Sequence, residues 1–173
     1  MSWAFKDRRK PVKPFKPYRG LDDLPAYPHS PWTKDIRKKL ADWSLEAFEY
    51  YAKVNHWIPY RKATGDFYAL SPRGRKWLIE VKSTWKTEFE NPVLAFATLD
   101  ASNSLEALKR IPGLNYGLDV YFAGNRAWKV CLNCEDVLKQ LLPKVKRRNF
   151  TTRWRWFSDT HQTLNLEAFL AYH

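Results

Sequence analysis

A short hairpin that carries charged residues inside an apolar strand most strongly limits the folds open to this chain. Residues 66–70 (DFYAL) have the composition of a strand, and residues 76–82 (KWLIEVK) have that of a second one. Between them, Ser71–Gly74 has Pro at its second position and Gly at its fourth, which is typical of a β-turn. The sequence therefore predicts two antiparallel strands joined by a tight connection.

The second strand of this hairpin places an acid and a base where apolar residues are expected. Side chains alternate along a strand, so Ile79 and Val81 face one way while Glu80 and Lys82 face the other. Charged groups removed from water are usually paired or bound to a metal ion. The turn lets Asp66 return close to Glu80 and Lys82. We therefore expect two carboxylates and one ammonium at one end of the hairpin.

The remaining pattern predicts an α/β fold with a mixed central β-sheet flanked by helices. The expected elements are a helix from Ser30-Pro31 to about residue 55 with room for a break at 42–44, a short strand over 57–60, a loop over 83–93, a helix over 94–110, strands over 119–123 and 127–132, a short helix over 135–142, a strand over 151–157 and a terminal helix over 164–172.

Positive charge is concentrated in two short segments of the 173 residues. The net charge is +12, of which residues 1–20 carry +6 and residues 143–156 carry +6, so the remaining chain is neutral. Prolines crowd residues 1–29, which we interpret as a flexible basic arm ahead of a single domain over residues 30–173. Clustered Lys and Arg favour a polyanion such as nucleic acid, because they release counterions from phosphates. A solubilising surface or a membrane-surface patch is the alternative.

The residues expected to contact nucleic acid come from these segments and from the loop after the hairpin. They are Arg8, Arg9, Lys10, Lys13, Lys86, Lys144, Lys146, Arg147, Arg148, Arg153 and Arg155. In residues 153–157 (RWRWF), a strand would turn both arginines to one side and both tryptophans to the other. The tryptophans would then stack on bases or pack in the core beneath a basic surface.

The acid and lysine set suits metal-assisted hydrolysis of a phosphodiester. Oxygen ligands from Asp66, Glu80 and the carbonyl of Val81 suit Mg²⁺, which also binds phosphate. Lys82 could orient the attacking water or stabilise the charged phosphorus centre. A structural ion pair at a sheet edge is the alternative interpretation.

Gly65-Asp66 followed after thirteen residues by Glu80-Val81-Lys82-Ser83-Thr84 resembles the PD-(D/E)xK nuclease superfamily, whose fold is restriction-endonuclease-like. Residues 44–130 are most similar to small Holliday junction resolvases and related phage or repair endonucleases, although Gly65 stands where the motif has Pro. The resemblance implies that Asp66 and Glu80 bind Mg²⁺, with Mn²⁺ able to substitute, and that Lys82 is catalytic. It also implies a homodimer and products with 5′-phosphate and 3′-hydroxyl ends.

Members of this superfamily often add a glutamate from the first helix, and two candidates are present. On a helical wheel that starts at Leu45, Glu49 borders the apolar stripe and Glu46 lies further round. We therefore consider both as catalytic residues and Glu49 as the better metal ligand.

Together these features predict a Mg²⁺-dependent DNA endonuclease that recognises branched DNA in recombination or repair. A nuclease that acts on ends, flaps or single strands is an alternative of the same class. A non-catalytic nucleic-acid-binding module is an alternative of another class.

Cysteine content and hydropathy bear on the setting of the protein. Only Cys131 and Cys134 are present, and their CxxC spacing alone is a weak metal or redox signal. No apolar run reaches the roughly 18 residues of a membrane span, and the N-terminus does not resemble a signal peptide. The expected location is intracellular, in the cytoplasm of a bacterium, an archaeon or a phage-infected host.

Overall fold

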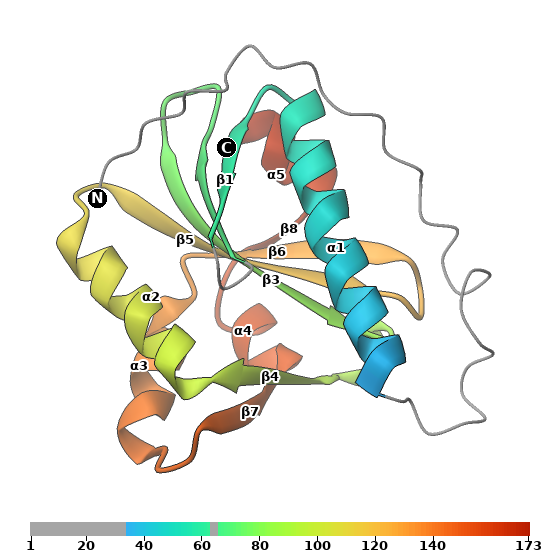
Figure 1. The fold of residues 1–173 in the computed structure, drawn as a ribbon, viewed down its shortest axis with the longest axis vertical. Helices are drawn as coiled ribbons and strands as arrows, with labels where there is room; N and C mark the ends of the chain where they lie inside the picture. Colours follow the sequence, from blue (N-terminus) through green and yellow to red (C-terminus); the bar gives the residue numbers. More distant parts are fainter. Residues whose placement is uncertain (1–33, 63–65) are drawn as a thin grey trace.

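The computed structural model describes residues 34–62 and 66–173 and confirms a mixed α/β fold (Figure 1). The 1–29 arm and the Ser30-Pro31 cap lie outside the described residues. The elements in chain order are α1 (Lys34–Val54), β1 (Ile58–Arg61), β2 (Phe67–Leu70), β3 (Lys76–Thr84), the 3₁₀ helix η2 (Glu88–Glu90), β4 (Val93–Ala97), α2 (Thr98–Arg110), β5 (Leu114–Phe122), β6 (Ala127–Leu132), α3 (Glu135–Leu141), the 3₁₀ helix η3 (Leu142–Lys144), β7 (Asn149–Arg153), α4 (Trp154–Ser158), β8 (Thr163–Asn165) and α5 (Leu166–Tyr172).

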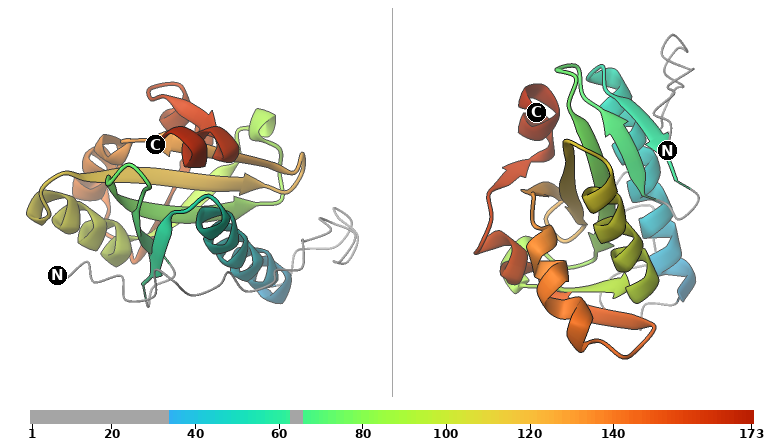
Figure 2. Two further views of the ribbon diagram at one scale, coloured as in Figure 1. Left: turned by 90° about the horizontal axis from the view of Figure 1, so that it is seen from above. Right: turned by 90° about the vertical axis from the view of Figure 1, so that its left-hand side faces the viewer.

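Within the described residues, the strands form a six-stranded sheet in the order β1-β2-β3-β5-β6-β8 and a two-stranded sheet of β4 and β7. The predicted hairpin is confirmed as β2 and β3, which pair antiparallel. The long strands β3 and β5 pair in parallel through the middle of the molecule (Figure 2). Because the chain must cross over between parallel strands, β4 and α2 lie between them in sequence.

The large sheet buries apolar side chains on both of its faces. On one face, Phe48 of α1 and Phe169 of α5 pack with Ile79 of β3. On the other face, residues of α2, α3, α4 and the small sheet pack with Leu78 and Leu118. Since Leu78 and Glu80 are two residues apart on β3, the charged residues of this strand project into the second layer.

Helix α1 has no break at residues 42–44, contrary to the break that the sequence allowed. Ser44 is buried and donates its hydroxyl to the carbonyl oxygen of Leu40 at 2.8 Å. This bond satisfies the hydroxyl inside the helix, so Ser44 does not cap a second one. The apolar residues Leu40, Ala47 and Phe48 bury one continuous side of α1 and hold it straight along the sheet.

The region after the hairpin differs from the predicted loop and helix. Strand β3 continues to Thr84, η2 follows, and β4 occupies residues that were assigned to the start of a helix. The helix α2 begins only at Thr98. The error has a physical reason: Leu94 and Phe96 alternate with exposed Val93 and Ala95, and β4 forms only by pairing with the distant β7.

The predicted strand over residues 151–157 is also wrong in its second half. Strand β7 ends at Arg153, and Trp154 begins the short helix α4. The expected alternation of arginines and tryptophans on opposite strand faces is therefore absent. Trp154 is buried against Phe122, whereas Trp156 is exposed.

Cys131 and Cys134 are buried and reduced within the described chain. Cys131, on β6, packs in the core beside the second layer. None of the described helices has the length and apolar character needed to cross a membrane.

Gly124 allows the β5–β6 hairpin to rest against the segment after β3. Its backbone N–H donates to the carbonyl of Lys86 at 3.3 Å, and an added Cβ would lie 2.7 Å from the backbone nitrogen of Thr87. Gly124→Ala should therefore lower the free energy of unfolding by about 1–3 kcal/mol, because backbone must move. Asn125→Ala, an exposed change in the same turn, is the control in urea denaturation. Equal effects of the two substitutions would contradict this packing.

Candidate active site

Glu80 and Lys82 lie on the face of β3 that packs against the second layer. Glu80 is only 3% exposed, and Lys82 is half-buried. Their partners in register on β5 are Leu118 and Val120, which are completely buried. The structure thus removes Glu80 from water within an apolar wall, where a carboxylate needs compensating partners.

Asp66 lies directly across from Glu80. Phe67, the first residue of β2, pairs with Ile79, so the preceding residue stands opposite Glu80 on the same face of the sheet. Opposed residues of antiparallel strands have Cα atoms about 4.5–5.5 Å apart. Asp66 is buried, and Lys82 is close enough for its charge to act on it. The structure therefore brings together the three side chains that the sequence placed at one end of the hairpin.

The surroundings of Asp66 favour its protonated form in the absence of a cation. Burial raises the pKa of Asp66 from its usual 3.8 to about 7, and the charge of Glu80 adds to this rise. The ammonium groups of Lys82 and Lys62 oppose it. Near pH 7, Asp66 is therefore balanced between its protonated and ionised forms.

Both lysines are placed over aromatic rings of neighbouring strands. The Nζ atom of Lys82 lies 4.7 Å from the ring centroid of Phe96 on β4, and that of Lys62 lies 5.1 Å from the ring centroid of Tyr68 on β2. A ring face attracts a cation and reduces the cost of removing it from water. Phe96 thus holds the Lys82 ammonium beside the carboxylates.

Tyr116 is a site residue that the sequence analysis missed. Its hydroxyl donates a hydrogen bond to Oε2 of Glu80, and its side chain is completely buried on β5. Burial and the charge of Glu80 raise the pKa of Tyr116 well above its usual value, so it remains a donor. The pairing depends on the register of β3 and β5. Because the two residues are 36 positions apart in the sequence, no local pattern reveals it.

A third carboxylate near Asp66 comes from α2. Asp100 lies in the first turn of this helix, four residues after Phe96, and its charge also raises the pKa of Asp66. Because the helix begins at Thr98 after β4, the site obtains this acid from a segment assigned to the interior of a longer helix by sequence.

The two glutamates of α1 occupy different surroundings. Glu49 is half-buried and forms an ion pair with Lys53 at 3.8 Å, while Glu46 is exposed. Phe48 and Ala52 of the same helix pack with Ile79, which faces away from Glu80. In residues 34–62 and 66–173, the described partner of Glu49 is therefore Lys53, and α1 covers the opposite face of the sheet.

The donor set that the structure offers to a metal ion is small. Within the described ranges, no three His, Cys, Asp or Glu side chains gather closely enough to hold an ion. Asp66, just before β2, and Glu80 on β3 remain as facing carboxylate donors, and the backbone carbonyl of Val81, which follows Glu80, is the third oxygen donor that the sequence suggested. This set fits Mg²⁺, which proteins commonly hold through one or two carboxylates while it keeps several waters.

A different buried carboxylate, Asp119 on β5, does not belong to this site. It pairs in register with Val81, so it faces the α1 side of the sheet. It is fully buried, both of its oxygens are unpartnered within the described chain, and burial raises its pKa well above the usual value. Burial therefore favours the protonated form of Asp119 in the core.

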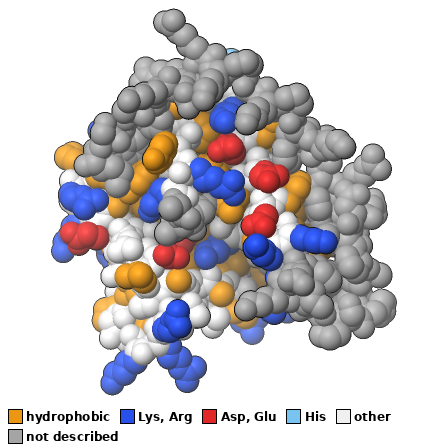
Figure 3. Space-filling model, in the orientation of Figure 1, with side chains coloured by type: hydrophobic (Ala, Val, Ile, Leu, Met, Phe, Trp, Pro, Cys, Tyr) orange, Lys and Arg blue, Asp and Glu red, His pale blue; other side chains and the backbone are white. Residues whose placement is uncertain are grey.

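The basic residues expected to bind nucleic acid are only partly described. Arg8, Arg9, Lys10 and Lys13 lie outside the described residues. Lys86 is exposed after β3, and the exposed cations between α3 and β7 are Lys144, Lys146, Arg147 and Arg148. In Figure 3, Lys and Arg side chains protrude at the lower end of the molecule, over this connection.

Arg153 and Arg155 have structural contacts that the sequence did not predict. Nη1 of Arg153 donates to the carbonyl of Asn91 at 3.1 Å, and Nη2 of Arg155 donates to that of Phe89 at 3.4 Å. Both side chains are exposed, yet they fasten the η2 segment to the start of α4.

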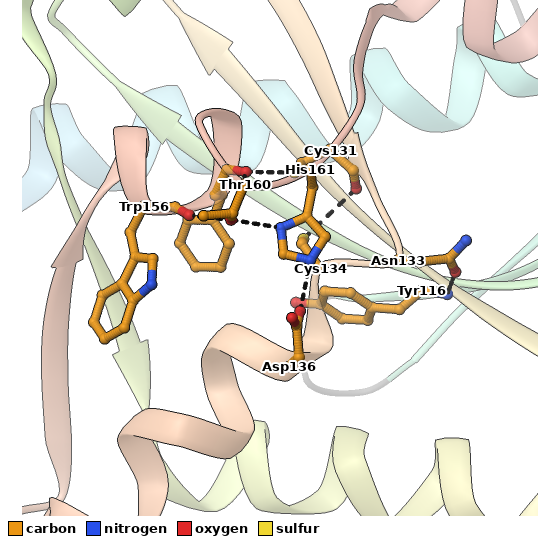
Figure 4. Close-up of polar contacts among 9 residues, drawn as sticks. Tyr116, Cys131, Asn133, Cys134, Asp136, Trp156, Thr160 and His161 are labelled. Atoms are coloured by element: carbon orange, nitrogen blue, oxygen red, sulfur yellow. Dashed lines mark hydrogen bonds and ion pairs between the residues drawn. The ribbon is translucent and has the colours of Figure 1, made fainter.

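A hydrogen-bonded chain near the cysteines is structural (Figure 4). His161 contacts Oδ1 of Asp136 through Nε2 and the hydroxyl of Thr160 through Nδ1, each at 2.7 Å. The Thr160 hydroxyl donates to the carbonyl of Trp156 at 2.6 Å, so its proton is directed away from His161. The chain therefore joins the turn after α4 to α3.

Comparisons with known proteins give no assignment for this site. No family model matches the chain, and no curated protein matches it either.

The raised pKa of Asp66 predicts how stability depends on pH without a metal ion. Below pH 4 the Asp66 carboxyl is protonated in both the folded and the unfolded states. Between pH 4 and 7 it ionises only in the unfolded chain, so the free energy of unfolding falls as the pH rises. Above pH 7 it is ionised in both states, and this loss of stability is complete. Asp66→Asn should therefore stabilise the protein in EDTA, and the gain should grow by on the order of 4 kcal/mol from pH 4 to 8. Urea denaturation across pH measures it, with exposed Asp159→Asn as control. A gain independent of pH would contradict the assignment.

The hydrogen bond from Tyr116 predicts a second stability effect. Tyr116→Phe leaves buried Glu80 without this donor and should lower the free energy of unfolding by about 1.5–3 kcal/mol. The loss should be smaller in a Glu80→Gln background, because a neutral acceptor binds the hydroxyl less strongly. Tyr60→Phe, at an exposed position, is the control in the same denaturation assay. An equal loss in both backgrounds would show that the two groups are not coupled.

Proposed function

We propose that this protein is a metal-dependent endonuclease that hydrolyses phosphodiester bonds of DNA, and that it selects its substrate by structure. The observation that carries the proposal is the pairing of Asp66 with Glu80 across β2 and β3, with the Lys82 ammonium beside them. Two buried carboxylates that repel each other are best reconciled by a bound cation. The resemblance to the PD-(D/E)xK nucleases points to the same three residues.

In this proposal some side chains hold the metal ion and others orient the reacting groups. Asp66, Glu80 and the carbonyl of Val81 would hold Mg²⁺, which supplies charge neutralisation at the phosphate and lowers the pKa of water. Tyr116 fixes one oxygen of Glu80 and so limits its rotation. Lys82, held over Phe96, donates to the attacking water or to a phosphate oxygen. Asp100, whose charge acts on Asp66, would complete the ligands through water.

The proposed substrate is branched DNA, with a four-way junction as the first example. The basic residues between α3 and β7, with Lys86, would contact phosphates, which position a protein without reading sequence. A homodimer would place two such sites on the two strands of a symmetric junction. We propose a role in DNA recombination or repair in an intracellular setting, including that of a phage.

The alternative is a non-catalytic nucleic-acid-binding protein, and a specific observation favours it. Tyr116 already satisfies one oxygen of Glu80, and Phe96 already receives Lys82, so the cluster is partly satisfied without a metal ion. The two functions differ in whether DNA is cut.

Cleavage assays separate them. Wild type should nick a synthetic four-way junction with Mg²⁺ or Mn²⁺ and not with EDTA. Lys82→Ala, Glu80→Gln and Asp66→Asn should each reduce the rate by at least about a hundredfold while binding to the junction persists, because such groups act in the transition state. Glu106→Gln, at an exposed position of α2, is the matched control. Full metal-dependent cutting by Lys82→Ala and Glu80→Gln would refute the site.

The same assay assigns the remaining acid. If Asp100 completes the site, Asp100→Asn should slow cleavage more than Glu49→Gln or Glu46→Gln, because its charge acts on Asp66 in the folded protein. The opposite order would assign the role to α1.

Salt dependence tests the basic segments. Changing Lys144, Lys146, Arg147 and Arg148 to Ala should reduce the slope of log affinity against log salt by up to about four, roughly one for each lost phosphate contact. Deletion of residues 1–20 should also flatten the slope. Substitution of the exposed but carbonyl-bound Arg153 should have a smaller effect. An unchanged slope in the fourfold variant would exclude this segment from the DNA interface.

A further inference from the structure

A cavity of about 540 Å³ lies at the edge of β6, outside the candidate active site. Among the described residues, β8 pairs with β6 only from Lys129 to Cys131, so the first residues of β6 have no described strand on that side. The cavity opens where α1, α5 and the β5–β6 hairpin meet. It is lined by Trp43, Tyr51, Asn55, Glu88, Tyr121, Arg126, Ala127, Trp128, Lys129, Asn165, Leu166, Glu167 and Leu170.

Aromatic rings form much of its wall. Three rings pack together here: the ring centroid of Tyr121 lies 4.9 Å from that of Trp43 and 4.8 Å from that of Trp128, and the two tryptophan centroids are 6.1 Å apart. Tyr121 is buried, whereas Trp43, Trp128 and Tyr51 are half-buried and line the space. A flat ligand could therefore stack on a preformed aromatic surface, at little cost in side-chain ordering.

The charges of the cavity balance, although the protein is strongly basic. Glu88 and Glu167 oppose Arg126 and Lys129. Lys129 is held by Oδ1 of Asn165 at 2.6 Å and by Glu88 at 3.9 Å. A phosphate site would carry excess positive charge, whereas this wall offers acceptors, amide donors and rings. These are the groups that recognise the edge and face of a nucleobase.

The position of the cavity relates it to the acid and lysine cluster. Tyr121 pairs with Ser83 on β3, and Lys82 pairs with the adjacent Val120. Because neighbouring residues of a strand face opposite ways, the aromatic wall and Lys82 lie on opposite faces of the sheet near the same end of β3. Glu88 of η2, which follows β3, completes the wall.

We infer that this cavity binds one unstacked nucleobase of a DNA strand, so that branched DNA with an unpaired nucleotide is bound more tightly than fully paired DNA. The inference rests on the proposed function for its choice of DNA, but the binding step needs neither the carboxylates nor a metal ion. It explains why the protein would select DNA by its structure, because only a base that has left the duplex can reach the aromatic rings of the cavity.

Binding measured in EDTA tests the inference. The probes are a duplex with one unpaired 2-aminopurine, the same duplex with an abasic residue at that position, and an unbroken duplex. Wild type should bind the unpaired base about tenfold more tightly than the abasic probe, which corresponds to one stacked base.

Trp128→Ala removes a ring, and Ala127→Phe fills the space without removing a contact. Both should abolish the preference and leave affinity for unbroken duplex unchanged, whereas Lys82→Ala should keep it.

Equal binding of the base and abasic probes by wild type would overturn the inference, and so would a preference that survives in Ala127→Phe. Sedimentation that shows a wild-type dimer and an Ala127→Phe monomer would also overturn it, by assigning the cavity to a second copy of the chain. The proposed function is judged separately: loss of cutting with retained base preference in Lys82→Ala supports both, and absence of metal-dependent cutting by wild type refutes only the nuclease.

Discussion

Electrostatic repulsion between Asp66 and Glu80 is the constraint around which the chemistry of this structure is arranged. Antiparallel pairing of β2 and β3 fixes the two carboxyl groups opposite each other. Burial weakens solvation of both, and the pKa of Asp66 rises to about 7 as a result. Selection for stability alone would favour apolar residues at these two positions, since apolar pairs of similar size are often more stable than buried charges. In the proposed function, a bound cation would neutralise this arrangement.

The rest of the second layer supports this pair. Strand β5 supplies Tyr116 as a donor to Glu80, β4 supplies Phe96 beneath Lys82, and α2 brings Asp100 nearby. These residues come from segments that are distant in sequence and meet through the parallel pairing of β3 with β5 and the crossover between them. The opposite face, packed by α1 and α5, holds a separate apolar cluster and the aromatic cavity.

Sequence reasoning succeeded where local rules decide the outcome. Alternation along residues 76–82 and the Pro and Gly of the turn were sufficient to predict the hairpin and to place Asp66 near Glu80. It failed where distant pairing decides. Strand β4 exists because β7 pairs with it, and Trp154 leaves the strand because its ring packs on Phe122. Nothing in the sequence around Tyr116 distinguishes it from a tyrosine that only packs in the core. The catalytic role of the hairpin residues stays a prediction.

A crystal of the protein soaked in Mn²⁺ tests the central claim most directly, because anomalous scattering locates the ion without reference to activity. The account predicts a peak between the carboxylates of Asp66 and Glu80, within bonding distance of the carbonyl oxygen of Val81, that vanishes in Glu80→Gln. A fully occupied peak elsewhere, or none at this position at pH 8, would contradict it.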